Sequence, residues 1–290
     1  MLVELSVDSI ERVVRMALLE DAPWGDLTSQ TLIPASARMS AELVAREPGV
    51  FSGGQVFAAA MSITDPNTRT ELLKEEGETF ANGDVLATVS GAARSVLQAE
   101  RVALNFVQRF SGIATLTARF VAAAEGTNAR IVDTRKTTPG LRLFERYAVR
   151  CGGGHNHRFS LSDAVLAKDN HLAVLTQNGS RDLTEALREA RASLPHTAHF
   201  EVEVDRPDQI EAVLAGGVDT IMLDNFTVEQ LRAGVQQVAG RALVEASGSV
   251  SLETVGEIAR TGVDIISVGA LTHSVRSLDL GLDFRVDAVL

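Results

Sequence analysis

Residues 152–158 read GGGHNHR and gather two histidines and an arginine directly after three glycines. Lys168 and His171 follow in the same stretch of chain. Arginine binds carboxylates through two parallel hydrogen bonds, and lysine binds phosphates as a compact charge. The stretch therefore predicts a site for a small ligand that carries several negative charges.

These cations belong to a basic segment within an acidic chain. The 290 residues contain 27 Lys and Arg against 38 Asp and Glu, a formal net charge of −11. Residues 130–171 contain eight Lys and Arg but four acids, so this segment alone carries +4. A nucleic-acid-binding domain is typically basic over a whole face. The distribution argues against a nucleic-acid partner and favours a small anionic ligand.

The elements that would position this site follow from an alternation of β-rich and helical segments after about residue 128. Six runs are rich in strand-forming residues: ARIVDTRK, VLAKDNH, HFEVEVD, TIMLDN, ALVEASG and IISVGA. Such alternation predicts a parallel sheet with helices outside it. Six strands are fewer than the eight of a standard barrel, so an incomplete barrel and an open sheet both fit.

Each of the six runs ends on polar or glycine residues, namely Arg135, Lys136, Lys168, Glu203, Asp224, Ser247, Gly248 and Gly269. In a β/α barrel the carboxyl ends of the strands form the active-site mouth, so these residues are expected to converge. Two glycine-containing turns, at 245–249 and 267–274, follow the last two runs. Loops in these positions often bind phosphate through backbone N–H groups, although tight turns without a ligand would look the same.

Acidic residues also lie at the predicted strand ends. Glu201, Glu203 and Asp205 share one strand face by the period of two, and Asp224 ends the next strand. Carboxylates crowded in this way repel one another unless a cation lies nearby. One interpretation is Mg²⁺, held through oxygens and shared with substrate phosphates or hydroxyls. The other is salt bridges to the lysines that end the first two runs, and both can hold together.

The same residues admit other chemistry. His155 and His157 have the H-x-H spacing of a metal pair, but the adjacent Arg158 would repel a metal ion. Lys168 could form a Schiff base with a carbonyl substrate, as in an aldolase. The single cysteine, Cys151, predicts a reducing compartment and a packed side chain rather than a nucleophile.

The residues before about 128 predict a mixed α and β domain. We expect a helix ending near Glu20, a hairpin with its turn at residues 82–84, and a long helix from about 95 to 124. A polar stripe follows this long helix through Arg94, Gln98, Arg101, Asn105 and Arg109. Apolar residues cover the rest of that helix, which favours packing on several sides and suggests a subunit interface.

Eight motifs in a fixed order carry a resemblance to a known family. They are EDxxxGDxTS at 20–29, ERVALNF at 100–106, DTRKTTPGLR at 133–142, GGGHNHR at 152–158, LAKDNH at 166–171, EVEVD at 201–205, LDN at 223–225 and EASG at 245–248. Together they resemble the quinolinate phosphoribosyltransferases, also called nicotinate-nucleotide pyrophosphorylases (carboxylating). The match runs from about residue 20 to LDLGLDF near the C-terminus, and DTRKTTPG and GGGHNHR are its most specific parts.

The resemblance implies an activity and a fold. The family makes nicotinate mononucleotide, CO₂ and pyrophosphate from quinolinate and phosphoribosyl pyrophosphate, with Mg²⁺, for NAD synthesis. The implied α/β fold has an N-terminal domain at 1–113, on which the segment 277–290 packs back, and an incomplete six-stranded α/β barrel at 114–276. Members are homodimers or higher assemblies in which the N-terminal region of one subunit covers the barrel mouth of the other.

The resemblance also implies roles for individual residues. The quinolinate carboxylates would contact Arg135, His157, Arg158, Lys168 and, in trans from the other subunit, Arg101. The catalytic residues would be Lys136, Lys168, Glu203 and Asp224, of which the two acids lie near the ribose hydroxyls and hold Mg²⁺ directly or through water. The 5′-phosphate of phosphoribosyl pyrophosphate would lie against Ser247, Gly248, Gly269 and His273.

Two departures and several alternatives accompany the resemblance. Ser249 stands where glycine or asparagine is common, and Phe159-Ser160 replaces a more usual Leu-Gly. The alternatives are a related barrel phosphoribosyltransferase with another acceptor, including relatives associated with molybdenum transport, a Lys168 aldolase, and a non-enzymatic phosphate-binding protein. The acidic amphipathic N-terminus and the short apolar runs predict a cytoplasmic protein without a membrane partner.

Overall fold

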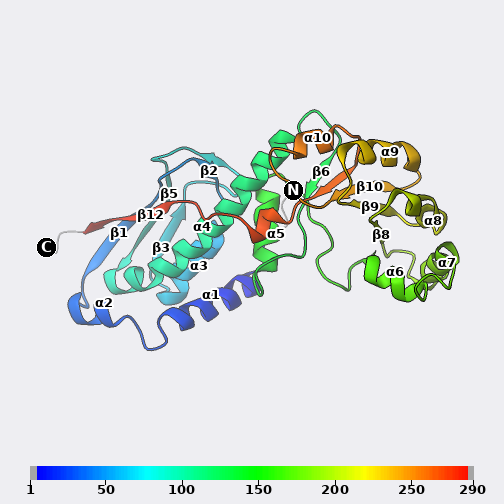
Figure 1. The fold of residues 1–290 in the computed structure, drawn as a ribbon. Coiled ribbons are helices and arrows are strands. Elements are labelled where there is room, and N and C mark those ends of the chain that lie inside the picture. Colours follow the sequence, from blue (N-terminus) through cyan, green and yellow to red (C-terminus); the bar gives the residue numbers. More distant parts are fainter. Residues whose placement is uncertain (1–4, 287–290) are drawn as a thin grey trace. The chain divides into compact units, whose positions relative to one another are not determined.

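The computed structural model describes residues 5–286, and the chain divides into two compact units (Figure 1). The first unit comprises the residues up to Ala118, Thr137–Gly153 and the residues from Ser274 onward. The second comprises Arg119–Lys136 and Gly154–His273. Both units differ from the bounds that the resemblance implied, because residues 137–153 belong to the first unit by their contacts. No described helix is both long and apolar enough to cross a membrane.

An antiparallel sheet in the order β12-β1-β5-β3 forms the centre of the first unit. Its strands are β1 (Arg38–Ala45), β3 (Arg69–Leu72), β5 (Val85–Ala92) and β12 (Leu280–Val286). β12 pairs with β1 although the two strands lie at opposite ends of the sequence. The C-terminal segment therefore packs back on the N-terminal unit, in line with the resemblance.

The hairpin expected around residues 82–84 is wrong. β4 (Thr79–Phe80) pairs with β2 (Gly49–Val50) in a separate sheet, whereas β5 pairs with β1 and β3. A turn does form here, and Gly83 adopts a φ of +90° in it. The turn carries the chain from one sheet to another, because both strands find partners that are distant in sequence.

Five helices begin among the described residues of the first unit. They are α1 (Val7–Asp21), α2 (Leu27–Leu32), α3 (Gly54–Thr64), α4 (Ala93–Ala123) and α5 (Arg142–Cys151). α1 and α4 confirm the two helices expected from the periodicity. α2 begins where the Asp26 side chain accepts hydrogen bonds from the N–H groups of Thr28 and Ser29. On α4, Arg101 and Asn105 of the polar stripe are exposed.

The second unit is an incomplete α/β barrel. Its sheet has the order β6-β11-β10-β9-β8-β7, and every pairing is parallel. The strands are β6 (Arg130–Val132), β7 (Val165–Ala167), β8 (Phe200–Val204), β9 (Thr220–Asp224), β10 (Leu243–Ser247) and β11 (Ile265–Ser267). Each lies within one of the six expected runs. β6 and β7 end the sheet on its two sides, so the six strands do not close into a complete barrel.

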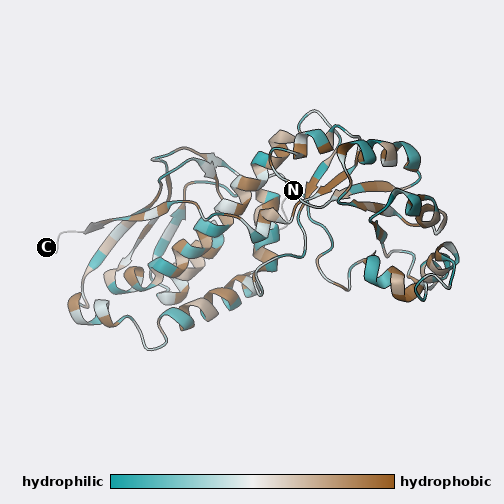
Figure 2. Cartoon of the chain, in the orientation of Figure 1, coloured by the Kyte–Doolittle hydropathy of each residue, from teal (hydrophilic) through white to brown (hydrophobic). Residues whose placement is uncertain are grey.

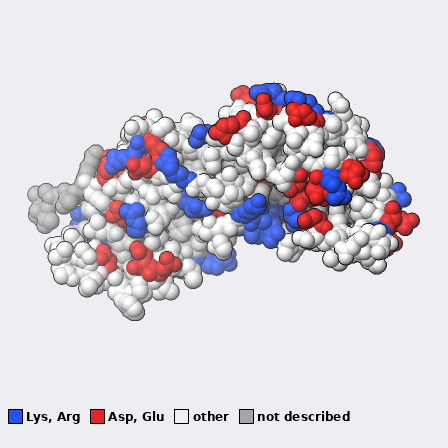
Figure 3. All heavy atoms as spheres, viewed as in Figure 1, with Lys and Arg blue, Asp and Glu red and all other residues white. Residues whose placement is uncertain are grey.

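Helices connect these strands and cover the outside of the sheet. They are α6 (Asp169–Leu175), α7 (Leu183–Ser193), α8 (Ile210–Ala215), α9 (Val228–Val238), α10 (Val255–Ala259) and α11 (Ala270–His273), with a 3₁₀ turn at Pro207–Gln209. The strands are mostly hydrophobic, while the helices carry hydrophilic faces (Figure 2). Acidic and basic side chains are interspersed over α9 and α10 (Figure 3). Apolar strand residues such as Ile221 and Leu223 are fully buried between the layers.

Candidate active site

The carboxyl ends of the barrel strands bring most of the predicted site residues to one edge of the sheet. Lys168 follows β7 directly, Glu203 lies near the end of β8, and Asp224 and Ser247 are the last residues of β9 and β10. Because neighbouring strands run parallel, these ends lie side by side. The convergence expected from the sequence is therefore present in the second unit.

Lys168 and Glu203 form an ion pair across the ends of β7 and β8. The Glu203 side chain is only 13% exposed, whereas that of Lys168 is 45% exposed. This contact confirms, for Lys168, the salt-bridge interpretation of the acidic strand ends. The expectation that Glu201, Glu203 and Asp205 share one face of a strand is wrong for Asp205. This residue lies beyond β8, is exposed, and contacts Arg206.

The turn after β10 has a backbone that favours glycine. Gly248 has a φ of +97°, and a Cβ there would overlap Asn225 Oδ1 and lie 2.8 Å from the Asn225 nitrogen. The next residue, Ser249, also adopts a left-handed conformation, with a φ of +48°. Such a conformation explains in physical terms why glycine or asparagine suits this position better than serine.

The turn after β11 brings together two of the predicted phosphate-site residues, Gly269 and His273, and the predicted catalytic residue Lys136. A Cβ at Gly269 would lie 3.0 Å from Nε2 of His273 and 3.2 Å from Cδ of Lys136. The hydroxyl of Thr272 donates a 2.7 Å hydrogen bond to the Lys136 carbonyl. Gly269 therefore leaves room for His273 and Lys136 to approach each other at the mouth.

The segment 155–158 runs beside β6 at the open side of the sheet. His155 forms a parallel bridge with Val132 and donates a 2.8 Å hydrogen bond from its N–H to the Ile131 carbonyl. Asp133, which is fully buried, accepts hydrogen bonds from Asn156 Nδ2 at 2.6 Å and from the His157 N–H at 2.8 Å. The cation-rich stretch is thus a backbone segment fixed to a barrel strand.

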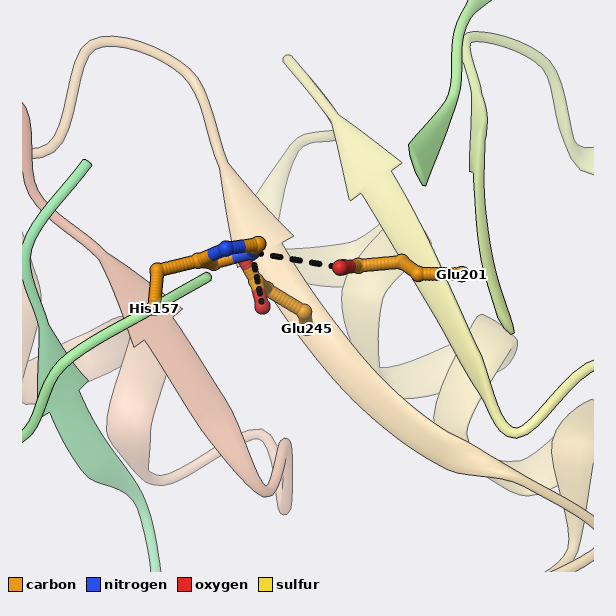
Figure 4. Close-up of side chains that lie close together, drawn as sticks. All are labelled: His157, Glu201 and Glu245. Carbon is orange, nitrogen blue, oxygen red and sulfur yellow. Dashed lines mark ion pairs between the residues drawn. The ribbon is translucent and has the colours of Figure 1, made fainter. Parts of the chain in front are cut away.

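The His157 ring points into the barrel, toward two buried glutamates (Figure 4). Its Nε2 lies 3.1 Å from Oε2 of Glu201 on β8 and 3.5 Å from Oε2 of Glu245 on β10. Its Nδ1 accepts a 2.7 Å hydrogen bond from the Arg158 N–H, which assigns the ring proton to Nε2. Both ring nitrogens therefore contact protein groups. The resemblance had implied that His157 contacts a quinolinate carboxylate.

His157 and His155 do not form the H-x-H metal pair that their spacing allowed. His155 is exposed, while the His157 side chain is 13% exposed and pairs with carboxylates. His157, Glu201 and Glu245 do form a group whose ligand-type atoms lie within 4.8 Å of one another. The hydrogen bond between His157 and Glu201 satisfies the ring nitrogen in this group without a metal ion.

Protons in this buried cluster are held tightly. Burial lowers the pKa of His157, but hydrogen bonds with Glu201 and Glu245 outweigh burial and raise it to about 10. Burial also raises the pKa of the Glu201 carboxyl. A ring with protons on both nitrogens could not accept the hydrogen bond from the Arg158 N–H. The raised pKa therefore describes a proton shared among His157, Glu201 and Glu245, and not a second proton on the ring, whose Nδ1 accepts the hydrogen bond from the Arg158 N–H.

Arg158 leaves the segment toward Ala164, whose carbonyl accepts a 3.0 Å hydrogen bond from the guanidinium. Burial lowers the pKa of Arg158, and the charge of Arg135 lowers it further. Two guanidinium groups near enough to repel each other are stabilised by an anion that binds both. The pair formed by Arg135 and Arg158 is suited to a ligand with carboxylate groups.

Comparison with known proteins identifies the family. A profile described as "Quinolinate phosphoribosyl transferase, C-terminal domain" matches residues 113–283, and one described as the N-terminal domain of the same enzyme matches residues 26–111. The chain belongs to the quinolinate phosphoribosyltransferase family. The two profiles meet near residue 112, on α4.

Named relatives and solved structures agree with this membership. The chain is 46% identical over 292 residues to the nicotinate-nucleotide pyrophosphorylase (carboxylating) of Mycobacterium leprae, covering 98% of this chain and 100% of that protein. It is 41% identical over 274 residues to the probable enzyme of the same name from Bacillus subtilis, covering 94% and 93%. The structure of NadC from Streptococcus pyogenes matches with a TM-score of 0.92 and 38% identity, over 98% of this chain and 99% of that one.

Several residues that support the site were not singled out by sequence reasoning. Asp133 and Glu245 support the 155–158 segment, and Glu145 supports the loop after Thr137. The fully buried Glu145 accepts hydrogen bonds from Arg109 at 2.6 and 2.9 Å and from the Thr138 N–H at 3.1 Å. One signal was available for Glu245, namely a charged residue within the apolar run LVEA.

Proposed function

We propose that this chain transfers the phosphoribosyl group of phosphoribosyl pyrophosphate to the ring nitrogen of quinolinate. The adjacent carboxylate is lost as CO₂, and the products are nicotinate mononucleotide and pyrophosphate, as required for NAD synthesis. The observation that carries the proposal is membership of the quinolinate phosphoribosyltransferase family, in a chain whose barrel strand ends bring Lys168, Glu203 and Asp224 to one edge of the sheet. The guanidinium groups of Arg135 and Arg158 supply the bidentate donors that a dicarboxylate needs.

Quinolinate would be held by its two carboxylates. Arg135, Arg158 and Lys168 are the groups of this chain that we assign to them. His157 would act behind Arg158, because both of its ring nitrogens contact protein groups. Charge-assisted hydrogen bonds of this kind are stronger than neutral ones, so recognition of a dicarboxylate over a monocarboxylate follows from the number of cations.

Phosphoribosyl pyrophosphate would bind along the other strand ends. Its 5′-phosphate would lie against the turns at Ser247–Gly248 and Gly269, with His273 beside them. Lys136 is exposed at the mouth and would face the pyrophosphate. Both turns need glycine to form, because a Cβ at Gly248 would meet Asn225 and a Cβ at Gly269 would meet His273.

Glu203 and Asp224 fit a Mg²⁺ ion shared with the substrate. They present carboxylate oxygens at the ends of the neighbouring strands β8 and β9, and two carboxylates are the usual protein contribution to a Mg²⁺ site completed by phosphates and water. The ion would neutralise charge on the departing pyrophosphate. The ion pair with Lys168 compensates the negative charge of Glu203.

The residues of the site would act by positioning charge. As pyrophosphate leaves, the ribose gains oxocarbenium character, which the carboxylates of Glu203 and Asp224 stabilise while Lys136 stabilises the leaving group. After the pyridine nitrogen bonds to the sugar, the ring is a pyridinium cation. It accepts the electron pair of the breaking C–CO₂ bond, and a proton then takes the place of the carboxylate. No general base is needed to remove the carboxylate.

We also propose that the active enzyme is a homodimer or a higher assembly in the cytoplasm. Arg101 is exposed on α4, on the polar face of a helix that is otherwise largely buried. In the proposed assembly, Arg101 of the partner subunit reaches the quinolinate site. The single cysteine, Cys151, is buried and fits a reducing compartment.

Turnover of the purified protein tests the reaction. We expect quinolinate to be consumed only when phosphoribosyl pyrophosphate and Mg²⁺ are both present, with nicotinate mononucleotide as the product. Nicotinate, which lacks the second carboxylate, serves as the control and is expected to react poorly. Efficient turnover of nicotinate would contradict the assignment of Arg135 and Arg158 to a dicarboxylate.

An aldolase based on Lys168 is disfavoured by the structure. A Schiff-base lysine attacks as an uncharged amine. Lys168 instead forms an ion pair with Glu203. Borohydride treatment in the presence of carbonyl substrates is therefore expected to leave Lys168 unmodified.

A related phosphoribosyltransferase with another acceptor is a separate alternative. It would be recognised by turnover of that acceptor in place of quinolinate.

A further inference from the structure

Three buried acids contact the ring or the backbone of His157 without any role in the proposed chemistry. Asp133 is fully buried, Glu201 is 4% exposed and Glu245 is 1% exposed. Ionisable side chains are costly to bury and are retained where they have specific partners. Here the partners are the ring and backbone of the segment that carries Arg158.

Two successive backbone N–H groups in this segment donate to side chains. The His157 N–H donates to Oδ1 of Asp133 at 2.8 Å, and the Arg158 N–H donates to Nδ1 of His157 at 2.7 Å. The second bond requires that Nδ1 carries no proton. It also requires that the ring stay in one orientation.

The glutamates supply both requirements. Oε2 of Glu201 lies 3.1 Å from Nε2, and Oε2 of Glu245 lies 3.5 Å from the same atom. An acceptor at Nε2 keeps the ring proton on that nitrogen and leaves Nδ1 free to accept. Because the two acids come from β8 and β10, the ring is fixed against two barrel strands at once.

We propose that Glu201 and Glu245 are positioning residues that hold the His157 ring so that its Nδ1 fixes the backbone from which Arg158 reaches quinolinate. The proposal rests on the assignment of Arg158 to quinolinate, and therefore on the proposed function. It requires a hydrogen-bond acceptor at Glu201, and the charge of that side chain is not needed. The glutamates themselves do not touch the substrate.

A matched pair of substitutions separates hydrogen bonding from volume and charge. Glu201→Gln keeps an oxygen acceptor for Nε2, whereas Glu201→Met keeps a similar volume without one. We expect Glu201→Met to raise KM for quinolinate about tenfold, the effect of one lost buried hydrogen bond, with KM for phosphoribosyl pyrophosphate nearly unchanged. Glu201→Gln should restore most of the affinity for quinolinate. Glu211→Gln, at an exposed acid on α8, serves as the control and should change neither constant.

The measurements test the positioning role of Glu201 independently of the proposed reaction. Equal losses in Glu201→Gln and Glu201→Met, or no change of KM in either, would overturn the positioning role. The nitrogen NMR signals of the His157 ring in the wild-type protein, assigned with a His157→Asn variant, give a test that needs no turnover. We expect a proton on Nε2 and none on Nδ1, and a protonated Nδ1 would overturn the proposal even in an active enzyme. Failure of the wild-type protein to use quinolinate would contradict the proposed function while leaving the ring geometry measurable.

Discussion

At the scale of single residues, the proposed site separates groups that touch the ligand from groups that orient them. Arg158 is held at its backbone by His157 and at its guanidinium by the Ala164 carbonyl. A side chain restrained at both ends loses little conformational entropy when it binds a carboxylate. Less of the free energy of its hydrogen bonds is therefore offset by the cost of ordering the side chain. Arg158 is therefore the residue whose removal should be most specific for one substrate.

Replacement of Arg158 by alanine should weaken quinolinate binding selectively. Loss of one charge-assisted bidentate contact costs on the order of 2 kcal/mol or more, which is about a thirtyfold rise in KM for quinolinate. Arg158→Lys keeps the charge but loses the planar fork, and an intermediate effect is expected. Steady-state kinetics with each substrate varied in turn provide the measurement. Equal effects on quinolinate and phosphoribosyl pyrophosphate would count against the assignment.

Sequence reasoning found the cations of the site but not the buried acids behind them. Arg135, Lys136 and Arg158 stand beside glycines or at strand ends, where a charged residue has no packing role and is easily noticed. In the sequence Asp133 looks like any other acid, and Glu245 is marked only by its place within the apolar run LVEA. Their importance depends on pairings across β6, β8 and β10 that only the folded chain brings together.

At the scale of elements, the strand-and-turn units of the barrel were predictable from sequence. Most of each β-rich run is apolar, apart from Glu201, Glu203 and Glu245, and each run stops at a polar or glycine residue, which marks both a buried parallel strand and its end. The prediction of a hairpin at residues 82–84 was wrong, because a local pattern does not determine which strands pair. Local alternation shows that two strands are present, but it does not show that β4 pairs with β2 and β5 with β1.

Substitution in the turn after β10 should damage the protein more than the same substitution in an open turn. Gly248→Ala adds a Cβ that overlaps Asn225, at a φ of +97°. Gly240→Ala is the control, because Gly240 has a φ of +74° but nothing lies within 4 Å of its Cβ. The control should lose about 1 kcal/mol of unfolding free energy from backbone strain alone.

Thermal unfolding and kinetics distinguish the two glycine variants. We expect Gly248→Ala to lower Tm further than Gly240→Ala and to raise KM for phosphoribosyl pyrophosphate. Gly240→Ala should leave that constant near the wild-type value. Equal Tm values for the two variants would show that the contact with Asn225 imposes no constraint on the turn.

At the scale of the whole molecule, the C-terminal segment is tied to the first unit by an ion pair as well as by β12. Glu47 accepts hydrogen bonds from Arg276 and from the Asp279 N–H, the latter at 2.7 Å. The hydrogen bond from Arg276, followed by that from Asp279, lowers the pKa of Glu47 to about 2. A depressed pKa means that the ionised carboxylate stabilises the fold.

The lowered pKa of Glu47 predicts that the difference in Tm between the wild-type protein and Glu47→Gln depends on pH. The contribution of Glu47 is fully present above its usual pKa of 4.5 and is lost as the pH falls through about 2. Glu47→Gln should therefore lower Tm at pH 7, and the difference from wild type should shrink as the pH is lowered from about 4.5. Melting curves across this range make the comparison. A difference that stays constant with pH would contradict the role of the charge.

Hybrid assemblies test whether Arg101 acts between subunits. Arg101→Ala and Lys136→Ala subunits should each be inactive alone, for different reasons. If Arg101 acts in trans, a mixed dimer contains one site with both native residues, so mixing the two variants should restore a fraction of the activity. Mass spectrometry of differently tagged subunits checks that hybrids form. Hybrids that form but stay inactive would rule out action in trans.

The most direct test of the account is a product balance with quinolinate labelled in the carboxyl group next to the ring nitrogen. The purified chain, phosphoribosyl pyrophosphate and Mg²⁺ are combined, and CO₂, pyrophosphate and nicotinate mononucleotide are measured together. We predict equal amounts of all three products, with the label entirely in CO₂. Release of pyrophosphate without labelled CO₂, or no turnover of quinolinate at all, would contradict decarboxylating phosphoribosyl transfer as the function of this protein.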